Sequence, residues 1–336
     1  MKVTISAALY NVASYVEDCV RSLYGQTMDD LEILLVDDGS SDGSIDIALR
    51  VLEDYPDRKP QVRVIRHEQN QGTSATKRDA ILNAKGEYVI VIDGDDWVDT
   101  RMVEKLYDKA QETAADMVFC DYWRVRGDEK WTDSLVRYGV IGDGDNVRNN
   151  IIDRRIPPYN VLKLIRKSIF TDNPVVWPQR CFGEDTVISV VSAYYARRIA
   201  HVREPLYYYR INSNSICHRE MTEQHCMRVY NEFMQNINIT IDFLVREGVA
   251  EKYGRGIIIN KIRTKNRLLP VTRKRKYRKL WWRTYPEINR ILLFGNKYYR
   301  PSYREWVFVA AVMLGLYPAN RERLRSPRLK LSQEWY

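Results

Sequence analysis

The sequence of 336 residues is poor in the residues that build disulfide frameworks and soft-metal sites. Its five cysteines are odd in number and scattered, and none has the paired spacing of metal ligands. The four histidines show no mutual ligand spacing either. Because disulfide frameworks belong mainly to small secreted domains, we expect reduced thiols, and histidines that are structural or lie on the surface.

Long apolar runs are also missing. No segment reaches the roughly 18 residues that a membrane-spanning helix requires, and the nearest is 306–317. The chain enters a predicted strand at residue 3 and has no hydrophobic region of a signal peptide before it. We therefore expect a cytoplasmic protein, in which 306–317 forms a buried helix or one that lies in a membrane interface.

Charge is unevenly distributed along the chain. Residues 1–218 carry 28 Lys and Arg against 34 Asp and Glu, whereas residues 219–336 carry 25 against 10. The positive charge therefore belongs to the C-terminal third. At this length we expect one large domain with an appendage, or two domains, and the change in charge places their boundary near residue 218.

Strands and helices alternate in the first hundred residues. Strands are predicted at 3–9, 31–36, 62–67 and 88–92, and helices at 14–23, 44–55 and 73–84. This alternation is typical of βαβ units and a mostly parallel α/β sheet with flanking helices. Right-handed crossovers then bring the loops at 10–11, 37–38 and 93–95 to one edge of the sheet. Residues 97–218 look mixed, and helices are predicted at 100–113, 185–195, 223–247 and 250–269.

The loops at this edge are rich in carboxylates. Asp93 and Asp95 follow a buried apolar strand and could share a divalent cation that holds a diphosphate. Asp38 could accept a hydrogen bond from a base, and Asp93 could accept from ribose hydroxyls. Lys77 or Arg78 could offset phosphate charge. The alternatives are an acidic turn at 93–96, a helix cap at Asp38 and solvated helix residues at 77–78.

Five segments in this order resemble the GT-A-fold, family 2 glycosyltransferases, inverting bacterial enzymes that build capsule, exopolysaccharide and other surface polysaccharides. The segments are Leu9-Tyr10-Asn11-Val12, Ser22-Leu23-Tyr24-Gly25-Gln26-Thr27, 34–44 (LLVDDGSSDGS), Ala84-Lys85-Gly86-Glu87-Tyr88 and Asp93-Gly94-Asp95-Asp96-Trp97. Phe182-Gly183-Glu184-Asp185 and Leu206-Tyr207-Tyr208-Tyr209-Arg210 resemble the acceptor-side motifs of the family. The likeness extends to about residue 218.

The resemblance implies a fold, a reaction and roles for individual residues. It implies a nucleotide-sugar-binding half at 1–100, an acceptor half at 101–218 and, outside the likeness, a basic helical region at 219–336. It also implies a nucleotide donor, with UDP as the nucleotide, and a saccharide or lipid-linked saccharide acceptor. The resemblance implies a metal site, in which Asp95, with Asp93, binds Mn²⁺ or Mg²⁺. It implies a catalytic pair, Glu184 and Asp185, with Asp185 as general base. The implied donor-binding residues are Tyr10, Asn11, Asp38, Lys77, Arg78, Asp93 and Gly94.

The base would remove the acceptor proton as the diphosphate leaves, and partial burial would raise its pKa. As the alternative, this pair only caps the helix that follows.

Three departures from the family pattern affect details. Ala8 stands where the family usually has proline, and Lys77 takes by position the role of an arginine for which Arg78 could substitute. Asn212 replaces a histidine that can reach the metal or the diphosphate in many relatives. We therefore expect the metal to depend more on Asp95.

The C-terminal third combines cations with aromatic residues. Residues 273–283 carry seven cations and three aromatics, and the apolar segment 306–314 follows between Arg304 and Arg321. This pattern favours contact with the inner, anionic membrane surface through 273–317. A solvated or intersubunit face and nucleic-acid binding are the alternatives, and we expect no nucleic-acid partner.

Two other functions compete with transfer of a sugar. A non-catalytic nucleotide-sugar or glycan-binding module of the same fold would not need both Asp95 and Asp185. A nucleotidyltransferase would want a glycine-rich, basic phosphate loop after the first strand, and 7–11 (AALYN) does not supply one.

Overall fold

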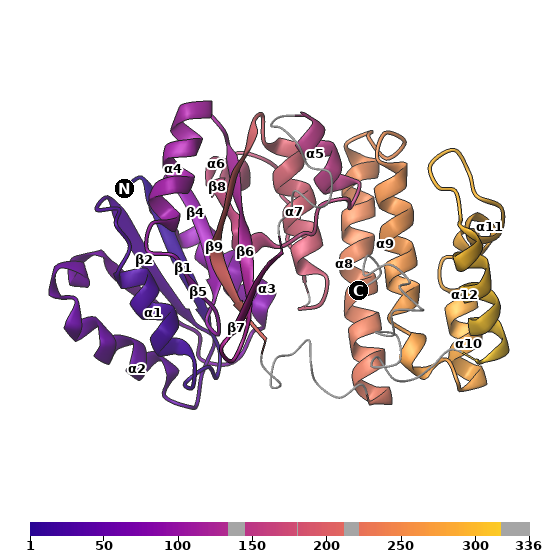
Figure 1. Ribbon diagram of the computed structural model, residues 1–336, viewed down its shortest axis with the longest axis horizontal. Coiled ribbons are helices and arrows are strands. Elements are labelled where there is room, and N and C mark those ends of the chain that lie inside the picture. Colours follow the sequence, from indigo (N-terminus) through magenta and orange to yellow (C-terminus); the bar gives the residue numbers. More distant parts are fainter. Residues whose placement is uncertain (134–144, 180, 212–221, 317–336) are drawn as a thin grey trace. The chain divides into compact units, whose positions relative to one another are not determined.

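The computed structural model describes residues 1–133, 145–179, 181–211 and 222–316. Contacts between residues divide the chain into two compact units, Met1–His218 and Arg219–Tyr336 (Figure 1). The first unit is an α/β domain, and the described part of the second consists of helices. Asn212, which we expected to stand in place of a metal-reaching histidine, lies outside the described residues.

A mixed sheet forms the centre of the first unit. Its strands follow the order β3-β2-β1-β4-β8-β6-β9-β5, with β7 paired to β6. The first four are parallel, β4–β8, β6–β8 and β5–β9 are antiparallel, and β6–β9 is parallel. The strands are β1 Val3–Leu9, β2 Leu31–Asp37, β3 Val62–Arg66, β4 Tyr88–Asp93, β5 Trp97–Val98, β6 Met117–Arg126, β7 Glu129–Asp133, β8 Lys163–Arg166 and β9 Ile199–Arg210. The predicted mostly parallel α/β sheet is confirmed.

Helices cover both faces of this sheet. Figure 1 shows α1, α2 and α4 on one side, and α3 and α7 on the other. The helices are α1 Val16–Tyr24, α2 Ser44–Val51, α3 Thr73–Asn83, α4 Met102–Thr113, α5 Asp145–Ile152, α6 Ser168–Thr171 and α7 Glu184–Tyr195. The helix predicted at 44–55 ends at Val51 and continues as short 3₁₀ segments, Leu52–Asp54 and Pro56–Gln61. Pro56 has no N–H for a helical hydrogen bond and also disfavours helical backbone at Tyr55.

A buried carboxylate ties the amino ends of the central strands together. Glu32 is completely buried, and its Oε2 accepts from Thr4 Oγ1 and from the Lys85 backbone N–H, both at 2.6 Å. Arg63 pairs with the other oxygen. The Gly86 N–H donates to Thr4 Oγ1 at 2.8 Å, and a Cβ on Gly86 would lie 2.4 Å from the Thr4 nitrogen. Only glycine therefore allows this turn to enter β4 beside β1.

The second unit packs its helices around an aromatic and aliphatic core. The helices are α8 Glu223–Arg246, α9 Gly254–Asn266, α10 Arg275–Arg283, α11 Pro286–Phe294 and α12 Tyr303–Leu314. Tyr277 and Trp281 belong to this core, and Trp281 is fully buried. The buried ammonium of Lys265 donates to Thr284 O at 2.6 Å and to Trp281 O, so it satisfies carbonyl groups at the end of α10. No helix among the described residues is long and apolar enough to cross a bilayer.

The close approach at Gly86 yields a prediction about stability. Gly86→Ala should lower the free energy of unfolding by about 1–3 kcal/mol or more, because the new methyl group overpacks against strand backbone that cannot move aside cheaply. The measurement is urea unfolding followed by tryptophan fluorescence. Lys85→Ala, an exposed side chain in the same turn, serves as control and should change stability by less than about 0.5 kcal/mol. Equal stability of the two variants would contradict the prediction.

Candidate functional site

The loops that follow β1 and β2 form one hydrogen-bonded unit. The Asn11 N–H donates to Ser40 Oγ at 3.1 Å, and Asn11 Oδ1 accepts from the Ser41 N–H at 2.9 Å. The Val12 N–H donates to Ser44 Oγ at 2.8 Å, and the Ala13 N–H donates to Asp42 Oδ2 at 2.8 Å. Asn11 has a φ of 51°, a left-handed backbone that asparagine tolerates better than most residues. The Asp-Gly-Ser-Ser-Asp segment thus fixes the loop that carries Tyr10, whose side chain is exposed.

The loop after β4 packs directly on the loop after β1. The Gly94 N–H donates to Ala8 O at 3.0 Å. A Cβ on Gly94 would lie 2.8 Å from that oxygen and 2.7 Å from Leu9 Cδ2. A side chain at this position would push the two loops apart. The glycine therefore sets the separation between Asp93–Asp95 and the first loop.

Asp38 is a buried acceptor for the segment that precedes α3. Its Oδ1 accepts from His67 Nδ1 at 2.7 Å and from the Gln71 N–H at 2.8 Å. Its Oδ2 accepts from Asn70 Nδ2 at 3.0 Å and from the Gly72 N–H at 2.8 Å. These bonds hold the start of α3 against the end of β2. The predicted contact between Asp38 and a nucleotide base stays a prediction, and it would require this carboxylate to exchange some of these partners.

His67 links Asp38 to a second carboxylate. Its Nε2 lies 3.1 Å from Asp79 Oδ2, and Asp79 Oδ1 accepts from Arg78 Nε at 2.8 Å. His67 is thus a structural residue between β3 and α3, and Arg78 is paired along its own helix. A contact between Arg78 and donor phosphate stays a prediction.

Lys77 is the centre of the site. Its side chain is only 3% exposed, and its Nζ lies 3.5 Å from Asp93 Oδ1, 3.5 Å from Glu184 Oε1 and 3.4 Å from Asp185 Oδ1. Burial by itself would lower the pKa of Lys77, but the surrounding Asp185, Asp93 and Glu184 outweigh it and raise the pKa well above its usual value. The lysine stays charged and brings the predicted metal-binding loop and the predicted catalytic pair to one point. Its predicted contact with donor phosphate stays a prediction.

The predicted catalytic pair, Glu184 and Asp185, occupies the first turn of α7. Gly183, with a φ of 88°, precedes the helix, and both carboxylates lie where the helix dipole favours negative charge. Burial and the neighbouring Asp185 raise the pKa of Glu184 to about 8, although Lys77 opposes this. Asp185 is more exposed, at 29% of its side chain. Its Oδ1 accepts from Asn160 Nδ2 at 2.9 Å. The sequence analysis predicted a raised pKa for Asp185, the expected base. In the structure, the carboxyl group with a raised pKa is that of its neighbour Glu184.

Residues of β9 hold the Asp95–Asp96 turn. Asp96 is buried and accepts from Tyr207 Oη at 2.5 Å and from the Arg210 N–H at 2.7 Å. Burial, with Asp95 and Asp93 nearby, raises its pKa well above the usual value. Arg210 Nε donates to Asp95 O at 2.9 Å, and its guanidinium lies 4.4 Å from the centre of the Trp97 ring. Asp96 does not cap a helix, because β5 lies between it and α4.

The donor set at this edge suits a hard divalent cation. Asp93 and Asp95 provide carboxylates one residue apart, and Mg²⁺ or Mn²⁺ commonly combines one or two carboxylates with substrate phosphates and water. In the described parts of the chain, no three or more His, Cys, Asp or Glu side chains are grouped to hold a metal by themselves. A cation at Asp93 and Asp95 would complete its ligand shell with oxygens of a bound diphosphate and of water.

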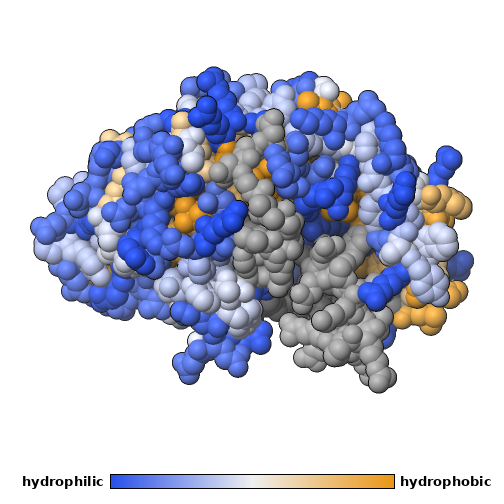
Figure 2. All heavy atoms as spheres, turned by 45° about the horizontal axis from the view of Figure 1, so that its top comes forward, coloured by the Kyte–Doolittle hydropathy of each residue, from blue (hydrophilic) through white to orange (hydrophobic). Residues whose placement is uncertain are grey.

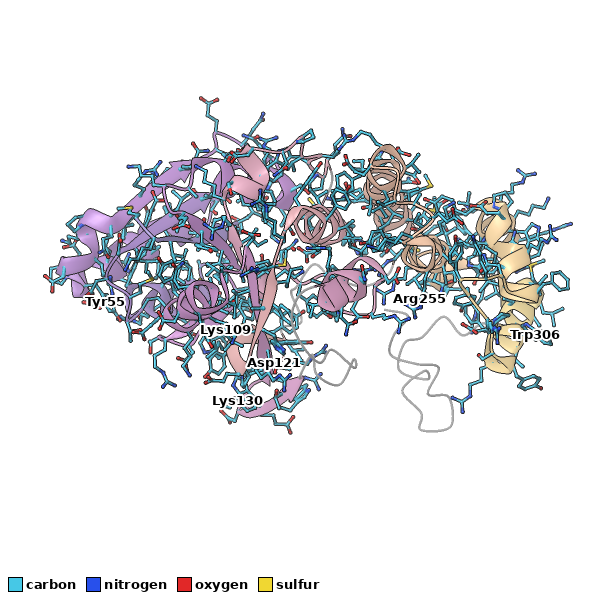
Figure 3. All side chains as sticks on the ribbon, turned by 90° about the horizontal axis from the view of Figure 1, so that it is seen from above. Tyr55, Lys109, Asp121, Lys130, Arg255 and Trp306 are labelled. Atoms are coloured by element: carbon cyan, nitrogen blue, oxygen red, sulfur yellow. The ribbon has the colours of Figure 1, made fainter. Side chains whose placement is uncertain are left out.

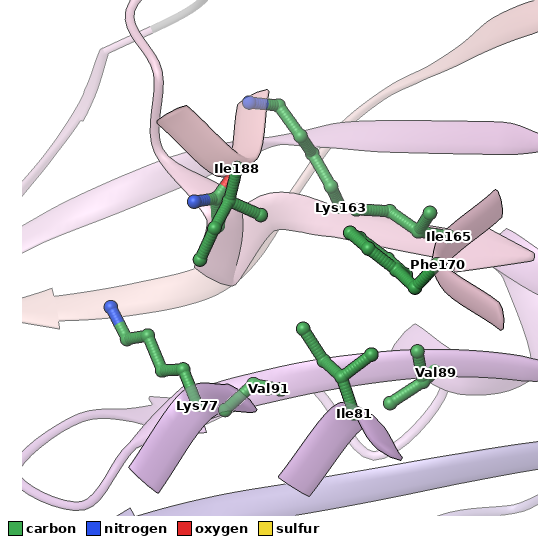
Figure 4. Close-up of a pocket in the computed structure, with 9 residues that line it drawn as sticks. Lys77, Ile81, Val89, Val91, Lys163, Ile165, Phe170 and Ile188 are labelled. Atoms are coloured by element: carbon green, nitrogen blue, oxygen red, sulfur yellow. The ribbon is translucent and has the colours of Figure 1, made fainter. Parts of the chain in front are cut away.

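Sequence reasoning missed three buried residues that are hydrogen-bonded to one another and to Asp185. Asn160, Lys163 and Ser189 are buried, and they connect to Asp185 through hydrogen bonds. Lys77 and Lys163 reach the small pocket beside them from α3 and β8 (Figure 4). No local motif marks these three residues. They belong to a short 3₁₀ turn, the start of a short strand and the second turn of α7, which only the folded sheet brings together.

Comparison with known proteins identifies the family. Residues 5–161 match the model of glycosyl transferase family 2. The putative glycosyltransferase EpsH of Bacillus subtilis is 32% identical over 65% of this chain and 63% of its own length, so the match covers less than two thirds of that relative. The uncharacterized glycosyltransferase EpsJ of the same organism is 30% identical over 68% of this chain and 67% of its own length.

Solved structures agree at the level of the fold. S. aureus TarS in complex with UDP-GlcNAc has a TM-score of 0.58 at 17% identity, covering 89% of this chain and 93% of that one. The mannosyltransferase PcManGT of Pyrobaculum calidifontis, in complex with GDP-Man and Mn²⁺, has a TM-score of 0.50 at 14% identity, covering 94% and 85%. The predicted GT-A fold and the predicted family are confirmed: the chain belongs to glycosyl transferase family 2.

Proposed function

We propose that the chain is an inverting, metal-dependent glycosyltransferase that moves a sugar from a UDP-linked donor to a saccharide or lipid-linked saccharide in surface polysaccharide biosynthesis. One observation carries the proposal. A single buried ammonium, Lys77, lies within 3.5 Å of Asp93, on the loop after β4, and of Asp185, at the start of α7. A leaving diphosphate and a general base need this juxtaposition, because they act on opposite faces of one anomeric carbon.

The donor would be held at the carboxyl edge of the parallel strands. Tyr10, Asn11 and Gly94 line the loops there, and Asp38 and Arg78 lie around the start of α3. Asp93 and Asp95 would hold Mn²⁺ or Mg²⁺. When bound, the cation would neutralise charge that develops on the leaving diphosphate. The TarS complex contains UDP-GlcNAc and the PcManGT complex contains Mn²⁺, which supports the choice of ligands.

The transfer itself would depend on Asp185. Its carboxylate accepts the proton of the acceptor hydroxyl as that oxygen bonds to the anomeric carbon, while the bond from this carbon to the diphosphate oxygen breaks. The departing electron pair stays with the nucleoside diphosphate. Burial and the neighbouring Asp185 raise the pKa of Glu184, which favours its neutral form beside the base.

Surface polysaccharide as the product is supported by relatives. EpsH and EpsJ are named as glycosyltransferases, and a relative from Bacillus spizizenii, 29% identical over 63% of this chain, is named poly(ribitol-phosphate) beta-glucosyltransferase. Acceptors of this kind are polymeric or lipid-linked and lie near the membrane. A cytoplasmic enzyme that attaches to the inner membrane face would reach them.

An exposed apolar surface on the second unit supports membrane contact. Its side chains include Phe294 on α11, Tyr303, Trp306, Val307, Met313 and Leu314 on α12, and Leu316. Hydrophobic residues gather over α12 in Figure 2, and Trp306 projects from that helix in Figure 3. The basic segment has a smaller part than we expected, because Tyr277 and Trp281 lie in the core, and Lys274 and Lys276 pair with Glu223. We therefore assign bilayer contact to α12, supported by the basic charge of 219–336.

The metal-binding role of Asp95 can be tested by calorimetry. Loss of a residue that only supports a metal ligand typically weakens metal binding by about 10–100-fold. Asp95→Ala removes a direct ligand, so it should weaken Mn²⁺-dependent binding of UDP by more than this. Asp108→Ala removes an exposed carboxylate of α4 instead and should bind like the wild type. If Asp95→Ala retained metal-dependent affinity for UDP, the proposed cation site would be wrong.

The base is tested by a split between binding and turnover. Asp185→Asn should bind UDP with Mn²⁺ normally, yet lower kcat by about 100-fold or more, because the amide cannot take the proton. A thermal-shift screen of UDP-sugars with Mn²⁺ first identifies the donor, since a ligand of the native state raises its apparent stability. UDP release with a panel of saccharide acceptors then reports kcat, and Asp108→Asn is the matched control. Normal turnover in Asp185→Asn would remove it as the base.

Membrane contact is tested by flotation with vesicles that contain phosphatidylglycerol, at low salt. Wild type should float, and Trp306→Ser/Leu314→Ser should not, because the apolar anchors are lost. Trp131→Ser/Leu82→Ser changes two exposed apolar residues of the first unit and should float like the wild type. Equal flotation of both double variants, or a wild type that stays with the soluble fraction, would contradict the proposed surface.

A further inference from the structure

A series of buried polar groups is connected by hydrogen bonds to Asp185. Asn160 is 8% exposed, Lys163 is 3% exposed and Ser189 is 1% exposed. Apolar side chains, among them Val91, Ile165 and Ile188, line the pocket that Asn160 and Lys163 share with Lys77 (Figure 4). Polar groups in such surroundings must bond to one another, because water cannot replace a missing partner without cost. Their bonding pattern is therefore informative.

The bonds connect Lys163 to Asp185 in three steps. Lys163 Nζ lies 2.6 Å from Ser189 Oγ, and Ser189 Oγ lies 2.7 Å from Asn160 Oδ1. Asn160 Nδ2 lies 2.9 Å from Asp185 Oδ1 and 3.2 Å from Asp185 O. Ser189 also lies one helical turn after Asp185 on α7, so the two share a face of that helix.

The donor and acceptor chemistry of these groups fixes the direction of each hydrogen bond between Lys163 and Asp185. Carbonyl oxygens can only accept, so the Ser189 hydroxyl donates its proton to Asn160 Oδ1 or to Pro158 O, 2.9 Å away, and Ser189 Oγ accepts from Lys163 Nζ. The Asn160 amide then accepts at its oxygen and donates from its nitrogen. Its nitrogen is thereby fixed toward Asp185, and the reversed amide would set a carbonyl oxygen against a carboxylate.

These bonds engage one of the two carboxylate oxygens of Asp185. Its Oδ1 accepts from Asn160 and lies 3.4 Å from Lys77 Nζ. Among the described residues, no group bonds to Oδ2. The orientation that Asn160 imposes therefore leaves Oδ2 for an incoming hydroxyl. A base must lie within hydrogen-bond reach of the proton that it removes, so this orientation matters for turnover more than for donor binding.

We propose that Lys163 is a positioning residue for the transfer reaction, acting through Ser189 and Asn160 to hold the Asp185 carboxylate in its reactive orientation. This inference rests on the proposed role of Asp185 as base. An apolar side chain would fill the position of Lys163 without the cost of burying an amine, and burial lowers the pKa of Lys163 to about 7, which is a measure of that cost. The relay accounts for a lysine at this place.

The test compares two serines of one helix. Ser189→Ala removes the middle of the relay. Ser192→Ala, the control, removes an equally buried hydroxyl whose bonds within the described parts of the chain go to backbone carbonyls of α7, with Ile188 O at 2.6 Å. Ser189→Ala and Lys163→Met should each lower kcat by about tenfold or more, since small misplacements of reacting groups are costly. Their KM for the donor and their affinity for UDP with Mn²⁺ should stay near wild type, as should all constants of Ser192→Ala.

A double variant shows whether Ser189 and Lys163 act through one series of hydrogen bonds or have two separate structural roles. The double variant Ser189→Ala/Lys163→Met should be no slower than the slower single variant, because either change already breaks the chain. Multiplied losses, or a loss of UDP affinity that matches the loss of kcat, would overturn the proposal. So would an unchanged kcat in Ser189→Ala.

A second readout does not depend on transfer. In protein labelled with ¹⁵N at asparagine, the Asn160 Nδ2 signals should move in Ser189→Ala and Lys163→Met and stay in place in Ser192→Ala. If the wild type transferred no sugar while these signals moved as expected, the proposed function would fail and the link from Lys163 to Asn160 would stand. Signals that stay in place in all three variants would overturn the relay.

Discussion

The site depends on one buried charge. Lys77 carries a positive charge from α3 into a place that three carboxylates approach within 3.5 Å, from the end of β4 and the start of α7. Without the ammonium, the charges of Asp93 and Asp185 would repel one another beside the buried Glu184. The two halves of the first unit therefore meet through Lys77, and the metal-binding and catalytic roles proposed for them require it to remain charged.

Much of the remaining structure holds the groups around Lys77 at fixed positions. Asp38 binds the segment that begins α3, and thereby places Lys77. Gly94 brings the Asp93–Asp95 loop against the loop after β1, and Arg210 binds it from β9. Asn160 fixes Asp185 from below. Each of these contacts uses a group that is buried or a backbone approach that a side chain would block, so a small change in any one would displace a charged group.

Local patterns predicted the parallel half of the fold and the sheet edge at which we propose that the donor binds. Apolar, β-branched runs predicted the four strands from β1 to β4, of which β2 and β4 end in acidic loops. The connection rules for parallel strands placed the loops after β1, β2 and β4 together. The antiparallel additions were not predictable in this way, because β8 has only the residues Lys163–Arg166 and pairs with segments far away in the chain. Local pattern also did not show which residues of 273–283 are buried: helix α10 turns Trp281 inward and its cations outward.

The sequence by itself determined which groups can do chemistry: the carboxylates at 38, 93, 95, 184 and 185 and the cation at 77 stand in short motifs whose order carries the family. Only the tertiary structure decided how they act on each other. Burial raises the pKa of Glu184, and Lys163 reaches Asp185 through partners on two other segments. Desolvation and hydrogen bonding depend on distance in space, and residues separated by a hundred positions acquire that proximity only when the sheet has formed.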